Sequence, residues 1–448
     1  MNKKVNFKLN AVQLLAIGFL ALIFIGGTIL CLPVSAADGS FTNYLDSIFT
    51  AASAVSLTGL VTVDTGTHWS TFGKVIIIIM IQIGGLAFMS VSTYIVMRLG
   101  KKISSKGSIP TSESINAYTI KGLIKMVKYV VSFTFIVELL GAVILSTQLI
   151  PEYGVGRGIL YSLFHSISAF CNAGFDLFGN FQSLIGHSSN TILLLTLSAL
   201  VIIGGIGFIV VFEIYRIITK ESKRISLNSK VVLTVTAVLL IVGTLGMFLL
   251  EYNNPDTIGT MSIKNKILNS FFSATAPRTG GFHSISADAM TSGGKLLNII
   301  LMFIGGSSGS TAGGIKTATF GIIIIAVISV VRRREDAGVY GRKISKETVY
   351  KAFALFIIAL TLISAITMIL TVTESKEKFV DLFFEATSAL SSAGISTGVT
   401  QRLSTVGKVI IVLSMYIGRL VPLLAAFSLS AYKKKKGFNY PEGKILIG

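Results

Sequence analysis

The sequence predicts an all-α integral membrane protein of four repeated units, each a membrane span, a re-entrant helix and a second span, set around one pseudo-fourfold axis. Three observations lead to this prediction. The 448 residues are 52% hydrophobic and 13% charged, with a mean hydropathy of +0.77, whereas soluble domains carry about 25% charged residues. Eight long apolar segments are interspersed with four short ones, and one residue pattern recurs in all four short segments.

Eight segments are long enough to cross a bilayer, which takes roughly 20 apolar residues. They are Ala11–Leu32, Phe72–Met97, Tyr129–Leu149, Thr191–Ile217, Val231–Leu250, Leu296–Val331, Tyr350–Val372 and Val406–Ala431. The first precedes Val34-Ser35-Ala36, which resembles a signal-peptide cleavage site. Its 22 residues exceed the roughly 7–15 of a signal-peptide core, so we interpret it as a retained span. The sixth is too long for one straight span and is interrupted by glycines.

Four shorter apolar segments lie between the spans and cannot cross the bilayer. They are Leu45–Leu57, Ile159–Asn172, Ile267–Ala276 and Phe379–Ser391. Each is either an interfacial helix or loop, or a re-entrant helix that enters the membrane and returns. The charges favour re-entrant helices, because with eight crossings 27 of the 39 Lys and Arg residues fall on one side. The segments concerned are 1–10, 98–128, 216–230, 332–351 and 433–448.

This charge asymmetry predicts that both chain termini are cytoplasmic, since basic residues collect on the inner side of a membrane. Twelve crossings would place the basic segments on both sides. The net charge of +19 is therefore explained by topology, and we expect no nucleic-acid partner.

The four short segments share one pattern, a Phe followed at fixed spacing by Ser or Thr, Ala and Gly. It reads Phe49-x3-Ser53-Ala54-x4-Gly59, Phe164-x3-Ser168-Ala169-x4-Gly174, Phe271-x3-Thr275-Ala276-x4-Gly281 and Phe384-x3-Ser388-Ala389-x4-Gly394. The glycines are 115, 107 and 113 residues apart, about a quarter of the chain, which indicates an internal repeat. The predicted units are 1–128 with a cytoplasmic linker, 129–230, 231–349, and 350–448 with a basic tail.

A second glycine element follows each pattern glycine by 25, 30, 24 and 24 residues. It reads Ile83-Gly84-Gly85, Ile203-Gly204-Gly205, Ile304-Gly305-Gly306 and Ile417-Gly418-Arg419. Small residues in membrane helices commonly serve close helix packing. For the first two elements, packing and a functional role are equal alternatives.

Four short helices that each end before a glycine predict a cation site. A helix end leaves carbonyls without partners, and at membrane depth these are tolerated where they line a wet cavity. Four ends around one axis form a ring of carbonyls and negative dipole ends, and glycine lets the backbone face the axis. The filter segments are Ser56, Leu57, Thr58, Gly59; Cys171, Asn172, Ala173, Gly174; Arg278, Thr279, Gly280, Gly281; and Ser391, Ser392, Ala393, Gly394. Because they hold no carboxylate ring, we expect selection by backbone carbonyls, which favours a monovalent cation, K+ first.

This organisation, with a single filter glycine in each unit, resembles the Trk/Ktr/HKT superfamily of potassium transporters over essentially the whole chain, and most of all the bacterial Ktr-type membrane subunit (KtrB). The resemblance implies one pseudo-fourfold pore of eight spans and four pore helices, with Gly59, Gly174, Gly281 and Gly394 as its filter glycines. It implies a multi-pass protein of the bacterial plasma membrane, surrounded by lipid and forming a homodimer. It also implies a separate KtrA-like cytosolic ring of nucleotide-binding subunits, with K+ as permeant ion and Na+ as a candidate activator.

The sixth span is interrupted by a glycine-rich stretch. It consists of Gly305, Gly306, Ser307, Ser308, Gly309, Ser310, Thr311, Ala312, Gly313 and Gly314, followed by Ile315 and Lys316. It is not a nucleotide-binding P-loop, because Lys316 does not directly follow the last glycine and apolar helices flank it. So many glycines cannot hold a helix at membrane depth, and such backbone must face protein or water. In the resembled family the matching stretch is a loop that obstructs the pore, so the resemblance assigns it as the gate.

Two cations lie at membrane depth, Lys316 after the glycine-rich stretch and Arg419 in the last span. One interpretation is a structural ion pair, for which Glu138 is a candidate partner of either cation. The other is a barrier to permeating cations near the pore axis, and the resemblance favours this role for Arg419.

The remaining reactive residues indicate no enzyme. We interpret Cys31 and Cys171 as small buried hydrophobic residues. The histidines show no metal spacing, and we interpret them as loop or interfacial residues: His68, His165, His187 and His283. No nucleophile–base cluster is visible, so a membrane enzyme is the weakest alternative. The main alternative is an alternating-access secondary transporter with broken helices, although such transporters usually divide into two halves.

Overall fold

The structure is a computed structural model that describes residues 11–104, 120–222 and 224–431. The expected cytoplasmic ends at 1–10 and 433–448, and part of the expected linker at 105–119, lie outside the described residues. The helices are α1 (Ala11–Cys31), α2 (Tyr44–Ser56), α3 (Thr71–Ser104), α5 (Ile120–Tyr153), α6 (Val155–Phe170), α7 (Thr191–Ile206), α8 (Phe208–Ile218), α9 (Leu227–Glu251), α10 (Ile263–Thr275), α11 (Ser292–Phe303), α12 (Thr317–Val331), α13 (Lys346–Thr373), α14 (Phe379–Ser391), α15 (Val399–Arg402) and α16 (Thr405–Ala431). Two 3-10 turns, Pro33–Ser35 and Ile185–His187, and the strands β1 (Gly338–Val339) and β2 (Arg342–Lys343) complete the described fold.

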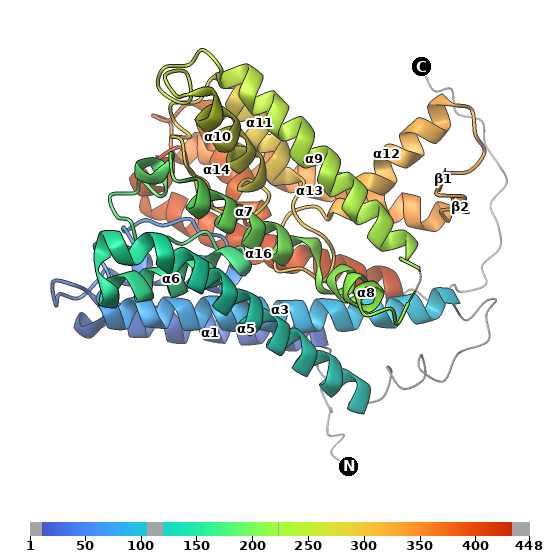
Figure 1. The fold of residues 1–448 in the computed structure, drawn as a ribbon, viewed down its shortest axis with the longest axis horizontal. Helices are drawn as coiled ribbons and strands as arrows, with labels where there is room; N and C mark the ends of the chain where they lie inside the picture. The colour runs from blue at the N-terminus through green and yellow to red at the C-terminus, as the bar shows by residue number, and fades with distance from the viewer. Residues whose placement is uncertain (1–10, 105–119, 223, 432–448) are drawn as a thin grey trace.

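Long helices surround the four short ones. In Figure 1, α1 and α3 run side by side and α5 runs obliquely to them, while the short helices α6, α10 and α14 lie in the left half of the view, away from α12 and the two strands. Each short helix packs on long helices of its own unit: α2 on α1 and α3, α6 on α5 and α7, α10 on α9, and α14 on α13 and α16. Each also contacts the preceding unit, through the pairs α3–α6, α7–α10, α11–α14 and α16–α2. The last of these pairs returns from the fourth unit to the first.

Five helices among the described residues are long and apolar enough to cross a membrane: α1, α3, α5, α9 and α13. The helices α7 and α8 pass the same test only as a pair, and they are bent by 100°. The predicted span Thr191–Ile217 is therefore wrong as a single straight helix. The sixth predicted span consists of two shorter apolar helices, α11 and α12, as its glycines indicated.

The break between α7 and α8 lies at Gly207, whose φ is +95°. A Cβ at this position would lie 2.8 Å from the Ser308 carbonyl oxygen. A segment from the third unit thus approaches the backbone here as closely as glycine permits, and the glycine supplies the backbone angle that turns the chain.

The C-terminal halves of the short helices occupy the interior. In α2 every residue from Ser47 to Ser56 is buried, whereas on α13 Ile357 and Val372 expose 56% and 81% of their surface. Outward apolar side chains are what a helix facing lipid requires. Side-chain caps fix several helix starts, since the hydroxyls of Ser226, Ser262 and Ser345 each accept a hydrogen bond from the backbone N–H three residues ahead. These residues start α9, α10 and α13, respectively.

A small hairpin follows α12, where the sequence pattern predicts only a basic loop. Val339 pairs with Arg342 across a turn formed by Tyr340 and Gly341, whose φ angles are +52° and +71°. Two positive φ angles are typical of the type I′ turn that closes two-residue hairpins. The Tyr340 hydroxyl shares a 2.6 Å hydrogen bond with Thr234 Oγ1, which ties the hairpin to α9.

Candidate functional site

The four pattern glycines meet at one point of the fold. They are Gly59, Gly174, Gly281 and Gly394, and their φ angles lie between +73° and +93°. A Cβ on Gly174 would lie 2.6 Å from the Cα of Gly281, and a Cβ on Gly59 would lie 2.6 Å from the Ala173 carbonyl oxygen. Both the backbone angle and this close packing require glycine. Segments more than 100 residues apart are thereby brought into direct contact.

The repeated Ser of the pattern holds the turn that carries the glycine. In the first unit the Ser53 hydroxyl accepts a hydrogen bond from the Gly59 N–H (2.9 Å). In the fourth unit the Ser388 hydroxyl accepts one from the Gly394 N–H (3.0 Å). Ser168 acts differently, donating to the carbonyl one residue beyond its glycine (2.7 Å). The spacing between Ser and Gly therefore has a structural cause in these three units.

Each filter segment also contains a residue other than glycine with a left-handed backbone conformation, two positions before its pattern glycine. These residues are Leu57, Asn172, Thr279 and Ser392, with φ between +51° and +73°. Outside glycine, left-handed backbone costs about 1–2 kcal/mol per residue. The same departure in four segments indicates one shared backbone conformation. The sequence gives no signal for it, because the four side chains have no common type.

Several side chains of the filter segments form contacts within the protein. The hydroxyls of Ser56 and Thr58 share a 2.7 Å hydrogen bond. The Arg278 guanidinium, on a residue only 7% exposed, lies 3.5 Å from the Gly305 carbonyl oxygen. Within the described part of the chain, no three His, Cys, Asp or Glu side chains form a metal site.

The stretch predicted as the gate forms a glycine-rich loop, residues 304–316, between α11 and α12. Its two stems lie side by side, because Ile304 and Ile315 form a parallel bridge. The Ser307 N–H donates to the Gly205 carbonyl (2.8 Å), at the end of α7. This contact satisfies a carbonyl that has no partner within its own helix, so the break in α7 and the glycine-rich loop stabilise one another.

The tip of the glycine-rich loop lies against the filter segments of the second and fourth units. The Thr311 hydroxyl is 3.2 Å from Asn172 Oδ1 and 3.3 Å from the carbonyl of Phe170. A Cβ on Gly313 would meet the carbonyl oxygen of Ser391. The loop therefore bridges the second and fourth filter segments.

Two buried cations hold this loop. Arg419 of α16 is 1% exposed; its Nη1 donates to the Thr311 carbonyl (2.5 Å), and its guanidinium stacks 3.7 Å from the centre of the Phe88 ring. Lys316 donates to the Ala312 carbonyl (2.6 Å). Within the residues that the structure describes, neither cation forms a salt bridge with a carboxylate. Neither basic side chain at the loop thus has a carboxylate partner within 4 Å among these residues.

Glu138 has other partners, so the ion-pair interpretation is wrong. Its carboxylate, on a residue 2% exposed in α5, accepts hydrogen bonds from the Gln82 amide (3.1 Å) and the Cys171 thiol (3.6 Å). The direction of this side chain, toward Gln82 of α3 and Cys171 just after α6, could not be predicted from its depth in the span. Cys171 is buried as predicted, while Cys31 is partly exposed.

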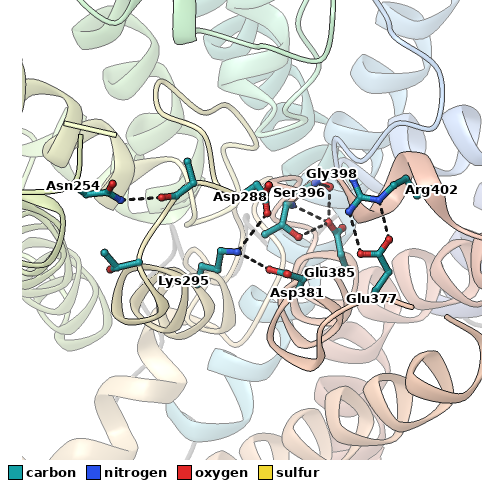
Figure 2. Close-up of polar contacts among 12 residues, drawn as sticks. Asn254, Asp288, Lys295, Glu377, Asp381, Glu385, Ser396, Gly398 and Arg402 are labelled. Atoms are coloured by element: carbon teal, nitrogen blue, oxygen red, sulfur yellow. Dashed lines mark hydrogen bonds and ion pairs between the residues drawn. The ribbon is translucent and has the colours of Figure 1, made fainter. Parts of the chain in front are cut away.

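Two buried residues secure the backbone beyond the filter glycines. Glu385 accepts a hydrogen bond from the Ser396 hydroxyl (2.5 Å) and one from the Thr397 N–H (2.9 Å), as Figure 2 shows in part. His165 stands at the equivalent position of the second unit, and its Nε2 accepts a hydrogen bond from the Leu177 N–H (3.2 Å). His165 is 1% exposed, so its prediction as a loop or interfacial residue is wrong. One position after the pattern Phe thus has the same role in two units.

Ion pairs join neighbouring units at the start of the short helices. Lys295 of α11 pairs with Asp381 of α14 at 2.8 Å (Figure 2), and Lys408 of α16 pairs with Asp46 of α2 at 2.7 Å. Each Lys follows its pattern glycine by 14 residues, and each Asp precedes a pattern Phe by three. This regular spacing is a sequence signal that could have predicted both contacts.

A further ion pair joins α15 to the segment that precedes α14. Arg402 Nε donates to the Glu377 carboxylate at 2.8 Å (Figure 2), and this hydrogen bond lowers the pKa of Glu377. Because the Arg402 side chain is 57% exposed, the pair contributes little to stability.

The second glycine element packs on the ends of the short helices. A Cβ on its first glycine would meet the carbonyl of the residue four positions before the pattern glycine. The contacts pair Gly84 with Val55, Gly204 with Phe170, and Gly418 with Leu390. In the third unit Gly305 meets Gly313 of the glycine-rich loop instead. Close packing therefore accounts for the first two elements. In the second unit the Gly205 carbonyl also accepts a hydrogen bond from the glycine-rich loop.

Comparison with known proteins identifies the family of this chain. The family profile TrkH, described as "Cation transport protein", matches residues 10–433. The chain belongs to the TrkH family of cation transport proteins. Two relatives match over nearly their whole length: potassium/sodium uptake protein NtpJ of Enterococcus hirae, 40% identical over 100% of this chain and 99% of that protein, and Ktr system potassium uptake protein B of Bacillus subtilis, 41% identical over 97% and 96%.

The fold agrees with this family. The solved structure of the potassium transporter TrkH from Vibrio parahaemolyticus superposes with a TM-score of 0.71 at 17% identity, covering 96% of this chain and 86% of that one. The predicted family resemblance and the helical membrane-protein fold are confirmed. As a member of the TrkH family, the chain is a membrane cation transport protein and not an enzyme.

Proposed function

We propose that this chain is the ion-translocating membrane subunit of a potassium uptake system. K+ passes along a pseudo-fourfold axis, where backbone carbonyls of 56–59, 171–174, 278–281 and 391–394 replace its hydration shell. The observation that carries this proposal is the meeting of four positive-φ glycines from four units. The absence of carboxylates from the filter segments favours a monovalent over a divalent cation. The names of the two relatives support potassium as that ion.

The glycine-rich loop is the proposed gate. It bridges two filter segments, and Arg419 and Lys316 bind its carbonyls. Each positive charge also opposes a passing cation, by about 4 kcal/mol at 4 Å and an effective dielectric constant near 20. Opening requires the loop to move away from the filter segments and from these cations.

The proposal extends to topology and assembly. Eight crossings and four pore helices place both termini in the cytoplasm of a bacterial cell, in the units 1–128, 129–230, 231–349 and 350–448. The name of one relative, a protein of a Ktr system, supports a separate partner subunit. We propose that this partner is a KtrA-like cytosolic ring of nucleotide-binding subunits and that the membrane subunit is a homodimer in lipid. The name of the other relative, a potassium/sodium uptake protein, connects Na+ with uptake, and the role that we propose for Na+ in this chain is that of an activator.

Uptake of K+, Rb+ and Na+ in a host that lacks its own potassium uptake tests the proposed function. We expect K+ and Rb+ to enter in preference to Na+, and no K+ uptake above the empty host would contradict the proposal.

The broken helices α7–α8 and α11–α12 favour one second candidate, alternating access. Flux that saturates at low turnover would support that candidate, whereas flux that rises steadily with the ion gradient supports a pore.

A further inference from the structure

We infer that Asn172 is a positioning residue that couples the glycine-rich loop to the selectivity of the filter. The inference rests on the proposed function and deepens it. Asn172 is fully buried, and its own backbone forms the left-handed turn of the second filter segment. Its side chain contacts two other parts of the site.

Both ends of the Asn172 amide are engaged. Nδ2 donates to the hydroxyl of Thr279, in the third filter segment, at 3.2 Å. Oδ1 accepts from the hydroxyl of Thr311, in the glycine-rich loop, at 3.2 Å. One side chain therefore bonds both a neighbouring filter segment and the proposed gate.

The second glycine element of α7 holds the amide in place. A Cβ on Gly204 would lie 2.7 Å from Asn172 Oδ1, and a Cβ on Gly205 would lie 3.5 Å from Nδ2. A side chain at Gly204 would clash with the amide oxygen, whereas one at Gly205 would make only an ordinary contact with the amide nitrogen, so Gly204 is the residue that confines the amide. Because the amide cannot swing away on this side, a displacement of Thr311 changes the hydrogen bonds of Asn172.

The Thr311 hydroxyl has one proton and several acceptors. The carbonyls of Gly204 and Phe170 lie 3.1 and 3.3 Å from it, besides the Asn172 oxygen. The proton is shared, so the contact with Asn172 is weaker than an undivided hydrogen bond. This places the expected effect at the lower end of the range for one hydrogen bond.

Among the described residues, a side-chain hydrogen bond from this position to the glycine-rich loop occurs in the second unit alone. At the equivalent positions Leu57 has no polar atom, and the buried Ser392 hydroxyl has no hydrogen-bond partner within the described residues. Thr311 is also the residue whose carbonyl binds Arg419. When the loop leaves Arg419, the Asn172 amide loses its loop partner, and the spacing of the second and third filter segments becomes less constrained.

The test compares the K+/Na+ uptake ratio and the basal K+ flux among Asn172→Ala, Thr311→Val and the double variant. Each single variant should lower the ratio about two- to fivefold, the lower part of the range for one net hydrogen bond, and raise basal flux. The K+/Na+ uptake ratio of the double variant should fall no further than that of the more affected single variant, because both substitutions remove the same hydrogen bond. Thr279→Val removes only the hydrogen bond between Asn172 and the third filter segment, so it should lower the uptake ratio without raising the basal flux. An unchanged ratio in Asn172→Ala, or fully additive effects, would overturn the inference.

The matched control is Asn298→Ala. Asn298 is equally buried, lies on α11 outside both filter and loop, and donates to the Gly294 carbonyl of its own helix (3.1 Å). It should keep the wild-type ratio, and an equal fall in this variant would mean general destabilisation and defeat the inference.

Gly281→Ser separates the two proposals. If it lowers the ratio while Asn172→Ala does not, only the coupling fails; if it too leaves the ratio unchanged, the filter assignment fails.

Discussion

Replacing Arg419 with Ala should raise K+ flux by releasing the glycine-rich loop. The substitution removes the 2.5 Å hydrogen bond to the Thr311 carbonyl and the stacking on Phe88 at 3.7 Å. A hydrogen bond from a charged group contributes about 1.5–3 kcal/mol, and a desolvated cation–π contact adds about 2 kcal/mol. Loss of the hydrogen bond alone would increase the population of the released loop about 10- to 150-fold, until that form dominates.

The assay is Rb+ uptake into proteoliposomes at matched protein content. Phe88→Ala removes the stacking alone and should raise flux less than Arg419→Ala. Arg419→Lys keeps the charge but loses the planar group, so it should be intermediate. Flux that stays the same or falls in a correctly inserted Arg419→Ala protein would refute the reasoning.

Adding Glu138→Ala to Arg419→Ala distinguishes the loop contact from an ion pair. Breaking a buried ion pair by removing one partner costs about 3–5 kcal/mol, and removal of the second partner relieves that cost. Because Glu138 is bonded to Gln82 and Cys171, we expect no recovery of protein level in the double variant. Recovery would show that the carboxylate had been the partner of Arg419.

Three further predictions follow from the site and its unit boundaries. Gly281→Ser should lower the K+/Na+ uptake ratio at least tenfold, because its φ is +75° and a Cβ would meet the backbone of Gly174; unchanged selectivity at normal expression would exclude the third filter segment. Deleting Ser307–Gly313 should raise maximal K+ flux, and the adjacent stems allow the chain to be rejoined; reduced flux from a folded, inserted protein would mean that the loop supports the structure instead of closing the path. Lys408→Ala should lower the thermal unfolding temperature in detergent by removing the partner of Asp46, a loss of about 1–3 kcal/mol; the exchanged pair Lys408→Asp with Asp46→Lys should regain part of it, and a melting temperature unchanged by Lys408→Ala would contradict a stabilising pair.

The arrangement of spans and short helices could be predicted because it depends on segment length, apolarity and charge. The pattern from Phe49 to Gly59 and its three repeats identified the short helices to within a few residues of their observed bounds. The repeated Ser and Gly are local requirements of one turn, so the sequence records them at fixed spacing.

The rest depends on contacts between segments far apart in the chain. The bend at Gly207 depends on the close approach of Ser308 from another unit, and the residues next to Gly207 in the sequence do not predict this contact. The left-handed angle of Leu57 and its three equivalents is imposed by the packing of the filter segments, which overrides the ordinary preference of those residues. The partner of Glu138 depends on how α5 is rotated about its axis, which hydrophobic length does not determine.

Only the third unit carries a glycine-rich loop among the described residues, and this has a consequence for how the path opens. In an assembly of four identical chains, any obstruction is present four times, and opening depends on how four copies act together. The proposed gate is one segment of one chain, in contact with two filter segments, so its displacement would be a single event with a single equilibrium constant. The dependence of opening on any signal that acts through this loop should therefore show no cooperativity within one molecule. Steep responses would have to arise from contacts between separate molecules.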